Sequence, residues 1–400
     1  MSKTTILNNI SELFTSGKHG ILKDAAIVIE DDTIKDIGQA NEINKNNSGD
    51  VIDLNGKTVT PGLIDPHTHL IFSGTREFEL EQKLQGLSYM EILKRGGGIN
   101  YTVSKTREAS KSELRKDALK RLDIMLQHGT TTIEAKSGYG LTVDDEKKIL
   151  DITNGLDHTV DTVTTFLGAH AVPEEYSLEP EKYIDLLIDE MIPMASERAK
   201  FIDVFCERGA FTPEQSKRIL QEGKKAGMIP KIHADEFSDT GGARIAYEVD
   251  AISADHLLNS SKENLSAMAS KGITGVFLPA TPFSIMSMKY PDINMIRSTG
   301  VNLALATDFN PNCYAPSMLF VISLACYYMK MTPAEAILGS TINAAKAIGI
   351  DKYTGSLDIG KKADITVFSV SNHRLIPYSL GINTVSMVMK NGNMVYERAD

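Results

Sequence analysis

Eight short apolar segments alternate with longer amphipathic stretches between residues 61 and 357. Apolar runs of this length, separated by segments of helical periodicity, favour buried parallel strands joined by helices. Eight strand–helix units in one chain favour a closed barrel over an open sheet. We therefore predict an α/β fold with a (β/α)8 TIM-like barrel over residues 61–357. The predicted strands are Leu63–His67, Thr130–Ala135, Thr162–Gly168, Phe201–Phe205, Ile229–His233, Ala251–Ser253, Gly275–Leu278 and Val301–Ala306, and the clearest helical stretches are Lys111–His128 and Thr212–Ala226.

Both chain ends show a different, β-rich pattern. Residues 1–60 and 358–400 contain short apolar runs separated by turn residues, which is typical of hairpins. Neither end alone has enough strands for a stable core, so we predict that they pair into one small β-sandwich domain. The predicted hairpins lie at Ala25–Gly38, Val51–Val59 and Val385–Tyr396, and the last two have Asn-Gly turns.

The composition indicates a folded globular protein and argues against some classes of binding partner. The net charge is −10 and basic residues are scattered, which argues against nucleic acid and anionic membranes as partners. The three isolated cysteines, Cys206, Cys313 and Cys326, suggest neither a disulfide framework nor a thiolate zinc site. The longest apolar run, Met318–Met329, is too short to span a bilayer and predicts a buried helix. With no signal peptide visible, we expect a cytoplasmic protein.

Histidines gather where the predicted strands end. His67 and His69 are two residues apart, so in an extended chain their side chains point to the same side. His170, His233 and His256 follow the third, fifth and sixth strands, and Asp308 follows the eighth. Three histidines and one carboxylate match a mononuclear catalytic metal site with an open position for water. We predict that its ligands are His67, His69, His233 and Asp308, the alternative being unrelated surface or core histidines.

Three of these strand-end residues are candidates for catalysis. A metal ion in such a site activates water as hydroxide, and Asp308 can ligate the metal and also accept the water's proton. Glu236, three residues beyond His233, can orient the water or shuttle a proton. His256 can polarise a substrate carbonyl. The alternatives are a solvated loop carboxylate for Glu236 and a helix-capping or core histidine for His256.

Two further residues are candidates for substrate recognition. Arg76 follows the first histidine pair and offers a bidentate fork for a carboxylate. Spacing alone favours the alternative, an ordinary surface arginine paired with Glu77 or Glu79. Tyr139 lies between two glycines, so its loop can approach a ligand closely.

These motifs resemble the metal-dependent amidohydrolase superfamily, with His-x-His on strand one, histidines on strands five and six and an aspartate on strand eight. More narrowly, the chain is similar to the imidazolonepropionase family. The narrower resemblance rests on Pro66–Arg76, Gly96–Ile99, Thr102-Val103, Thr106-Arg107, Lys136–Leu141, Gly168–Pro173, His233–Phe237 and Ser253–Leu257.

The resemblance implies hydrolysis of 4-imidazolone-5-propanoate to N-formimidoyl-L-glutamate in L-histidine degradation, with one Zn²⁺ or Fe³⁺ per subunit. By position, it assigns Arg76 to the propanoate, and Tyr139 and His170 to the ring. It assigns Glu236 and His256 to catalysis, with Glu236 also in contact with the substrate. We also expect a homodimer. The loop after strand eight contributes Asn310, and it continues through Asn312 and Cys313 where the family usually has a glycine and a small hydroxyl residue. A backbone contact can be kept at Asn312, whereas a hydroxyl contact at Cys313 is weakened.

Two features of the strands bear on the metal site, and two rival functions stay open. Strand four, Phe201–Phe205, carries no lysine that could bridge two metals as a carbamate, so one metal is expected. Lys136, after strand two, has no obvious role as a ligand. The first rival is another hydrolase with the same metal site, either a different cyclic amidohydrolase or a deaminase of a cyclic amidine, which would release ammonia. The second is a catalytically inactive barrel that serves as an assembly partner.

Overall fold

The computed structural model describes residues 3–399 except 88–90, 93–94 and 288. One of its two sheets has eight strands in the order β5 to β12, and every neighbouring pair is parallel. The last strand meets the first through a bridge between Thr68 and Phe309 and a 2.8 Å hydrogen bond from His69 N to Phe309 O, so the sheet forms a nearly closed barrel. The strands are β5 (Leu63–Thr68), β6 (Thr130–Lys136), β7 (Asp161–Ala169), β8 (Phe201–Cys206), β9 (Ile229–Ala234), β10 (Ser253–His256), β11 (Thr274–Phe277) and β12 (Asn302–Leu305).

All eight predicted barrel strands are present, and the predicted fold class is confirmed. The boundaries of the sixth strand were wrong, because the prediction covers Ala251–Ser253 whereas β10 is Ser253–His256. The local sequence did not indicate a buried strand here, because Asp255 and His256 are polar and their burial depends on distant partners, His67 and Glu236.

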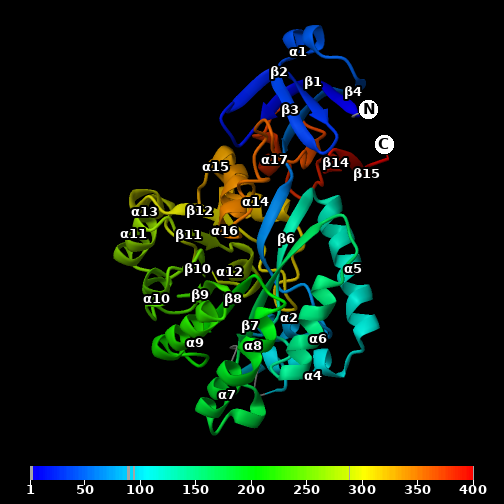
Figure 1. Ribbon diagram of the computed structural model, residues 1–400. Coiled ribbons are helices and arrows are strands. Elements are labelled where there is room, and N and C mark those ends of the chain that lie inside the picture. The colour runs from blue at the N-terminus through cyan, green and yellow to red at the C-terminus, as the bar shows by residue number, and fades with distance from the viewer. Residues whose placement is uncertain (1–2, 88–90, 93–94, 288, 400) are drawn as a thin grey trace.

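Helices surround the barrel (Figure 1). Capping boxes at Ser110 and Thr212 start α5 and α9, which confirm the two predicted helical stretches. The buried helix predicted from Met318 is α14. None of the described helices is both long enough and apolar enough to cross a membrane. The helices are α1 (Ala40–Asn46), α2 (Phe78–Leu84), α4 (Ile99–Glu108), α5 (Lys111–Gln127), α6 (Val143–Asn154), α7 (Pro180–Leu186), α8 (Ile192–Ser196), α9 (Pro213–Lys225), α10 (Gly242–Val249), α11 (Lys262–Ser270), α12 (Ala280–Ser284), α13 (Ile293–Thr299), α14 (Met318–Tyr327), α15 (Pro333–Gly339), α16 (Ile342–Ala347) and α17 (Leu375–Tyr378), with short turns η1 (Glu174–Tyr176) and η2 (Leu187–Met191).

The second sheet joins the two chain ends, which lie close together in Figure 1. It is a seven-stranded mixed sheet of order β15-β14-β13-β4-β1-β2-β3, in which β4 pairs antiparallel with β13. The division of the chain into domains at residues 60 and 358 stays a prediction. The strands are β1 (Thr4–Phe14), β2 (Ile21–Glu30), β3 (Thr33–Gln39), β4 (Asp50–Pro61), β13 (Ile365–Phe368), β14 (Val385–Lys390) and β15 (Asn393–Glu397).

Two of the three predicted hairpins are present, β2–β3 and β14–β15. The hairpin predicted at Val51–Val59 was wrong, because this segment is part of the single strand β4. Asn55 and Gly56 do take positive φ angles of 52° and 72°, as an Asn-Gly turn would. They form an irregularity instead of a turn, since the residues on both sides pair in parallel with β1.

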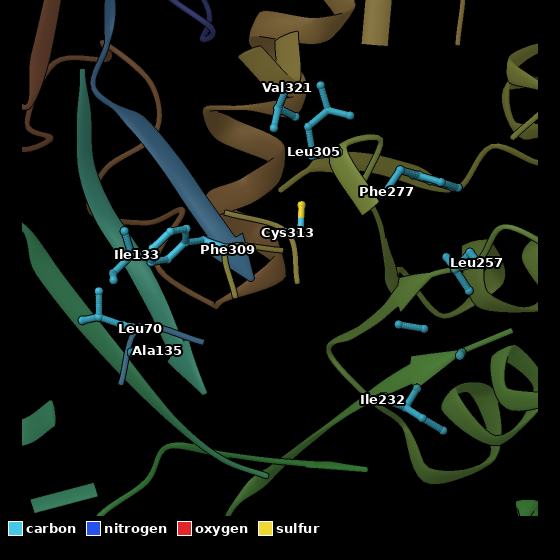
Figure 2. Close-up of a cluster of buried hydrophobic side chains, with 14 of the residues drawn as sticks. Leu70, Ile133, Ala135, Ile232, Leu257, Phe277, Leu305, Phe309, Cys313 and Val321 are labelled. Carbon is cyan, nitrogen blue, oxygen red and sulfur yellow. The ribbon is translucent and has the colours of Figure 1, made fainter. Parts of the chain in front are cut away.

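The main hydrophobic core lies between the barrel strands and the helices around them. Figure 2 shows part of it, including Ile133 of β6, Ile232 of β9 and Leu305 of β12. Phe309, from the segment after β12, belongs to the same cluster and is fully buried. Burial of these side chains stabilises the barrel near the point where its first and last strands meet.

Substitution of Gly392 tests the packing of the two chain ends. A Cβ atom here would lie 2.2 Å from Asp31 O in the β2–β3 turn, and φ is +73°. At Gly360, φ is +86° but a Cβ atom would meet nothing within 4 Å. We expect Gly360→Ala to lower the free energy of unfolding in urea by about 1–2 kcal/mol through backbone strain alone. Gly392→Ala should cost roughly 1–3 kcal/mol more through the clash. Equal losses would contradict this contact.

Candidate active site

The four predicted metal ligands converge at the carboxyl ends of the barrel strands. The ring centroids of His67 and His69 are 5.4 Å apart, and His233 from β9 lies 4.5 Å from His67. Asp308 Oδ1 is 3.5 Å from His67 Nε2 and 3.7 Å from His69 Nε2. Two overlapping groups each have ligand atoms within 4.8 Å of one another: His67, His69 and Asp308, and His67, His233 and His256.

The donor atoms of this cluster fit a metal ion. His67 Nε2, His69 Nδ1 and His233 Nε2 are buried without a hydrogen-bond partner in the described part of the chain. Because buried polar atoms nearly always have partners, unpaired nitrogens on neighbouring rings fit a cation as partner; His69 faces Asp308 Oδ1 through its other nitrogen, Nε2. Burial lowers the pKa of all three histidines well below its ordinary value, so the imidazoles are neutral, as metal ligands must be.

Two of these strand-end residues have a strained backbone conformation. His256 has a φ of 73° and Asp308 a φ of 53°, both in the left-handed region that non-glycine residues rarely adopt. The Asp308 carboxylate is held by a 2.7 Å hydrogen bond from Thr281 Oγ1 to Oδ2. Burial raises the pKa of Asp308 to about 7. Strain of this kind is kept where the surrounding structure fixes a side chain for function.

Glu236 and His256 lie together beside the ligand cluster. His256 Nε2 is 3.7 Å from Glu236 Oε2, and the His256 ring is 5.2 Å from that of His233. Burial, with the charges of Asp308 and Glu207, raises the pKa of Glu236 well above its ordinary value. Its side chain is only 12% exposed, so it is not a solvated loop carboxylate. Both residues line a pocket with Phe237, Leu258, Leu278, Pro279, Thr281, Pro282, Ile285 and Pro291.

Tyr139 and His170 form the wall of the site next to His69. The rings of His69 and His170 stack with centroids 4.9 Å apart, and Tyr139 lies 5.2 Å from His170. The loop that carries Tyr139 is held by the buried carboxylate of Glu146, which accepts hydrogen bonds from the backbone N–H groups of residues 138, 140 and 141. The loop is therefore fixed before any ligand binds.

Arg76 is paired with Glu79, which is one of the two interpretations that its spacing left open. Its Nε and Nη2 atoms donate hydrogen bonds of 2.7 and 2.8 Å to the Glu79 carboxylate. The pair is buried, however, and not on the surface. Glu79 also accepts a 2.7 Å hydrogen bond from Gly98 N. Burial lowers the pKa of His170 to about 4, and the charge of Arg76 adds to this shift.

The loop after β12 uses its own side chains to hold its shape. Asn310 Oδ1 accepts hydrogen bonds from the backbone N–H groups of Asn312 and Cys313. Asn312 Oδ1 accepts a 2.6 Å hydrogen bond from Lys83 Nζ of α2. Cys313 is buried, with Sγ 3.6 Å from Thr307 O. The substrate contacts assigned to Asn310 and Asn312 stay predictions.

Sequence reasoning missed the carboxylates behind the histidines. Asp255 Oδ2 lies 2.8 Å from His67 Nδ1, and Asp203 Oδ2 lies 3.1 Å from His233 Nδ1. Such partners orient metal-binding imidazoles and fix their tautomers. A signal was available for Asp203, because a charged residue inside the predicted buried strand Phe201–Phe205 must have a partner.

Removal of one ligand should release the metal. We expect His233→Ala to lose bound metal, measured as metal per subunit by mass spectrometry of the purified protein. His170→Ala is the matched control, because the half-buried His170 ring lies 6.1 Å from that of His233 but belongs to neither ligand group. It should keep its metal. Full metal content in His233→Ala would show that the ligand assignment is wrong.

Known proteins are similar to this chain in sequence, and others are similar to it in fold. The model of the amidohydrolase family matches residues 58–395. An imidazolonepropionase of Geobacillus kaustophilus (strain HTA426) is 50% identical over 386 residues, which cover 94% of this chain and 91% of that protein. One of Alkaliphilus oremlandii (strain OhILAs) is 44% identical, with 98% of each chain covered.

Solved structures with the same fold are much more distant in sequence. A triazine hydrolase variant superposes with a TM-score of 0.77 at 16% identity, with coverage of 98% of this chain and 95% of that one. An adenosine deaminase from Xanthomonas campestris with bound zinc has a TM-score of 0.73 at 15% identity, with coverage of 98% and 92%. These likenesses concern the fold alone, whereas the family match and the close relatives concern the sequence. The chain therefore belongs to the amidohydrolase family and, within it, to the imidazolonepropionases.

Proposed function

We propose that this enzyme hydrolyses 4-imidazolone-5-propanoate to N-formimidoyl-L-glutamate, a step of L-histidine degradation. The observation that carries the proposal is the 50% identity, over 94% of the chain, to a relative named imidazolonepropionase. The convergence of three histidines and Asp308 supports the same reaction type, because ring opening of a cyclic amide needs an activated water molecule.

We further propose one Zn²⁺ or Fe³⁺ per subunit, held by His67, His69, His233 and Asp308. The Nε2 atoms of His67 and His69 face Asp308 Oδ1, and the buried ring nitrogens of His233 have no hydrogen-bond partner among the described residues. Strand β8 has no lysine that could form a bridging carbamate, which favours a single ion. When bound, the metal activates a water molecule for attack on the ring carbonyl carbon.

The surrounding side chains supply the proton transfers. Asp308 accepts a proton from the attacking water, since its Oδ1 faces the ligand histidines while Thr281 holds Oδ2. The carbon–nitrogen bond of the ring amide then breaks, and the leaving nitrogen takes up a proton. Glu236 and His256 lie 3.7 Å apart on the same side of the cluster, where one polarises the carbonyl oxygen and the other passes the proton.

Substrate recognition would come from the opposite wall. Tyr139 and His170 contact the ring, and Asn310 and Asn312 contact it from the loop after β12. Arg76 binds the propanoate group. Because Glu79 holds the edge of the guanidinium that carries Nε and Nη2, the propanoate would approach along the other edge.

We also propose a homodimer in the cytoplasm. Exposed aromatic and aliphatic side chains from α14 and the segment after α17 line one groove, and such patches commonly mark protein interfaces. They include Phe320, Tyr327, Tyr328, Leu380 and Ile382. The three free cysteines fit a reducing compartment.

The reaction is tested by the ultraviolet loss of 4-imidazolone-5-propanoate, with the product identified by mass spectrometry. We expect N-formimidoyl-L-glutamate and no ammonia. Ammonia release from a cyclic amidine, with no turnover of the imidazolone, would favour the rival deaminase. A protein that binds metal but turns over neither compound would favour the inactive barrel.

Arg76→Met tests the proposed recognition of the propanoate. Loss of a charge-assisted bidentate contact should raise KM by roughly 10–100-fold, since hydrogen bonds to charged groups contribute about 1.5–3 kcal/mol. The control is the substrate's propanamide analogue, which lacks the negative charge. The wild-type enzyme should discriminate strongly against the analogue, and Arg76→Met should not. Unchanged discrimination would remove Arg76 from this role.

A further inference from the structure

Five fully buried charged side chains form a cluster inside the barrel, behind the histidine ligands. We call this the buried charge cluster, and it consists of Glu134, Lys136, Asp203, Lys231 and Asp255. Lys136 has the most ion pairs in it. Its Nζ lies 2.6 Å from Asp203 Oδ2, 3.0 Å from Glu134 Oε1 and 3.3 Å from Asp255 Oδ2.

The two aspartates of the cluster are the ones that contact the imidazoles. Asp255 Oδ2 faces Nδ1 of His67, and Asp203 Oδ2 faces Nδ1 of His233. Asp203 Oδ1 also accepts a 3.1 Å hydrogen bond from the backbone N–H of His233. Lys136 therefore contacts the same carboxylate oxygen atoms that hold two ligands from two different strands.

Burial of the Lys136 ammonium group costs desolvation free energy, so an apolar residue would replace it unless the charge has a further role. Desolvation of a buried ion pair often exceeds its Coulomb gain, so such clusters are weak sources of stability. Fixed carboxylates, by contrast, keep each imidazole with Nδ1 toward the carboxylate and Nε2 toward the metal. Among the described residues, His67 Nε2 and both ring nitrogens of His233 have no hydrogen-bond partner, so Asp203 holds His233 through the backbone N–H and a close contact with Nδ1.

We propose that Lys136 is a positioning residue for the metal centre, which fixes Asp203 and Asp255 so that they hold His67 and His233 in their metal-binding orientation. This inference rests on the metal site of the proposed function. It gives a role to a residue of the Lys136–Leu141 motif that neither binds the metal nor lines the substrate pocket.

Loss of the positive charge of Lys136 and loss of its positioning role would change metal affinity in opposite directions, so the two effects can be distinguished. Removal of a positive charge near a cation site should tighten metal binding, because one repulsive interaction is lost. Removal of a positioning group should weaken metal binding, because the imidazoles lose their fixed orientation. Mutation of a group that orients a metal ligand typically lowers metal affinity by about 10–100-fold.

The experiment compares Lys136→Met with Lys231→Met in the full-length protein. Both variants remove one buried ammonium group, but Lys231 differs in its contacts: its Nζ lies 2.7 Å from Glu134 Oε2 and 3.3 Å from Pro66 O, and 3.9 Å from Asp255. Metal is removed with a chelator, and the Zn²⁺ dissociation constant is measured by competition with a chromogenic chelator. The absorption spectrum of the Co²⁺ form reports ligand geometry, and circular dichroism reports folding.

We expect Lys136→Met to bind Zn²⁺ roughly 10–100-fold more weakly and to show an altered Co²⁺ spectrum. Lys231→Met should bind Zn²⁺ as tightly as wild type, or more tightly. A folded Lys136→Met with unchanged or tighter Zn²⁺ binding would overturn the proposal, and so would equal weakening in both variants. If Lys136→Met does not fold, Asp203→Asn provides the test, since it keeps the side-chain shape but should also weaken Zn²⁺ binding. Wild-type protein that binds no Zn²⁺, Fe³⁺ or Co²⁺ would instead overturn the metal site itself.

Discussion

The site depends on the closure of the barrel between β5 and β12. Just beyond the ends of these strands, a 2.8 Å backbone hydrogen bond from His69 N to Phe309 O joins the two segments. A buried carboxylate completes the closure, because Asp65 on β5 accepts a 3.1 Å hydrogen bond from Thr307 N and a second one from the Thr307 hydroxyl. Asp308 follows Thr307 directly. Closure of the barrel therefore also brings Asp308 next to His67 and His69.

Stability and chemistry are concentrated at opposite ends of the barrel. The seven-stranded sheet contacts the ends where β5 and β6 begin, through a 2.9 Å hydrogen bond from Gly62 N to Asp364 O and a 2.8 Å hydrogen bond from Thr366 Oγ1 to Gly129 O. The histidines lie where the strands end. This division is general for such barrels, in which loops at the carboxyl face can change without loss of the core.

The interior of the barrel combines two electrostatic environments. Near the mouth, burial keeps the histidines neutral and raises the pKa of Glu236, which suits metal binding and proton transfer. Deeper inside, burial opposes the charge of Lys136, but Asp203, Glu134 and Asp255 raise its pKa above the ordinary value. The ammonium group thus stays charged among its carboxylates. The two environments meet at the Nδ1 atoms of His67 and His233.

The sequence by itself determined the fold class, the number of barrel strands and the identity of the residues that converge. Strand periodicity and the position of polar residues at strand ends are local properties, so His67, His69, His233 and Asp308 could be found without coordinates. Only the tertiary structure decided which groups contact one another across strands. The partners of Lys136 come from β6, β8 and β10, and the Asn55-Gly56 pair became an irregularity in a strand because β1 pairs on both sides of it. Such contacts join residues far apart in the chain, and no local pattern encodes their distance.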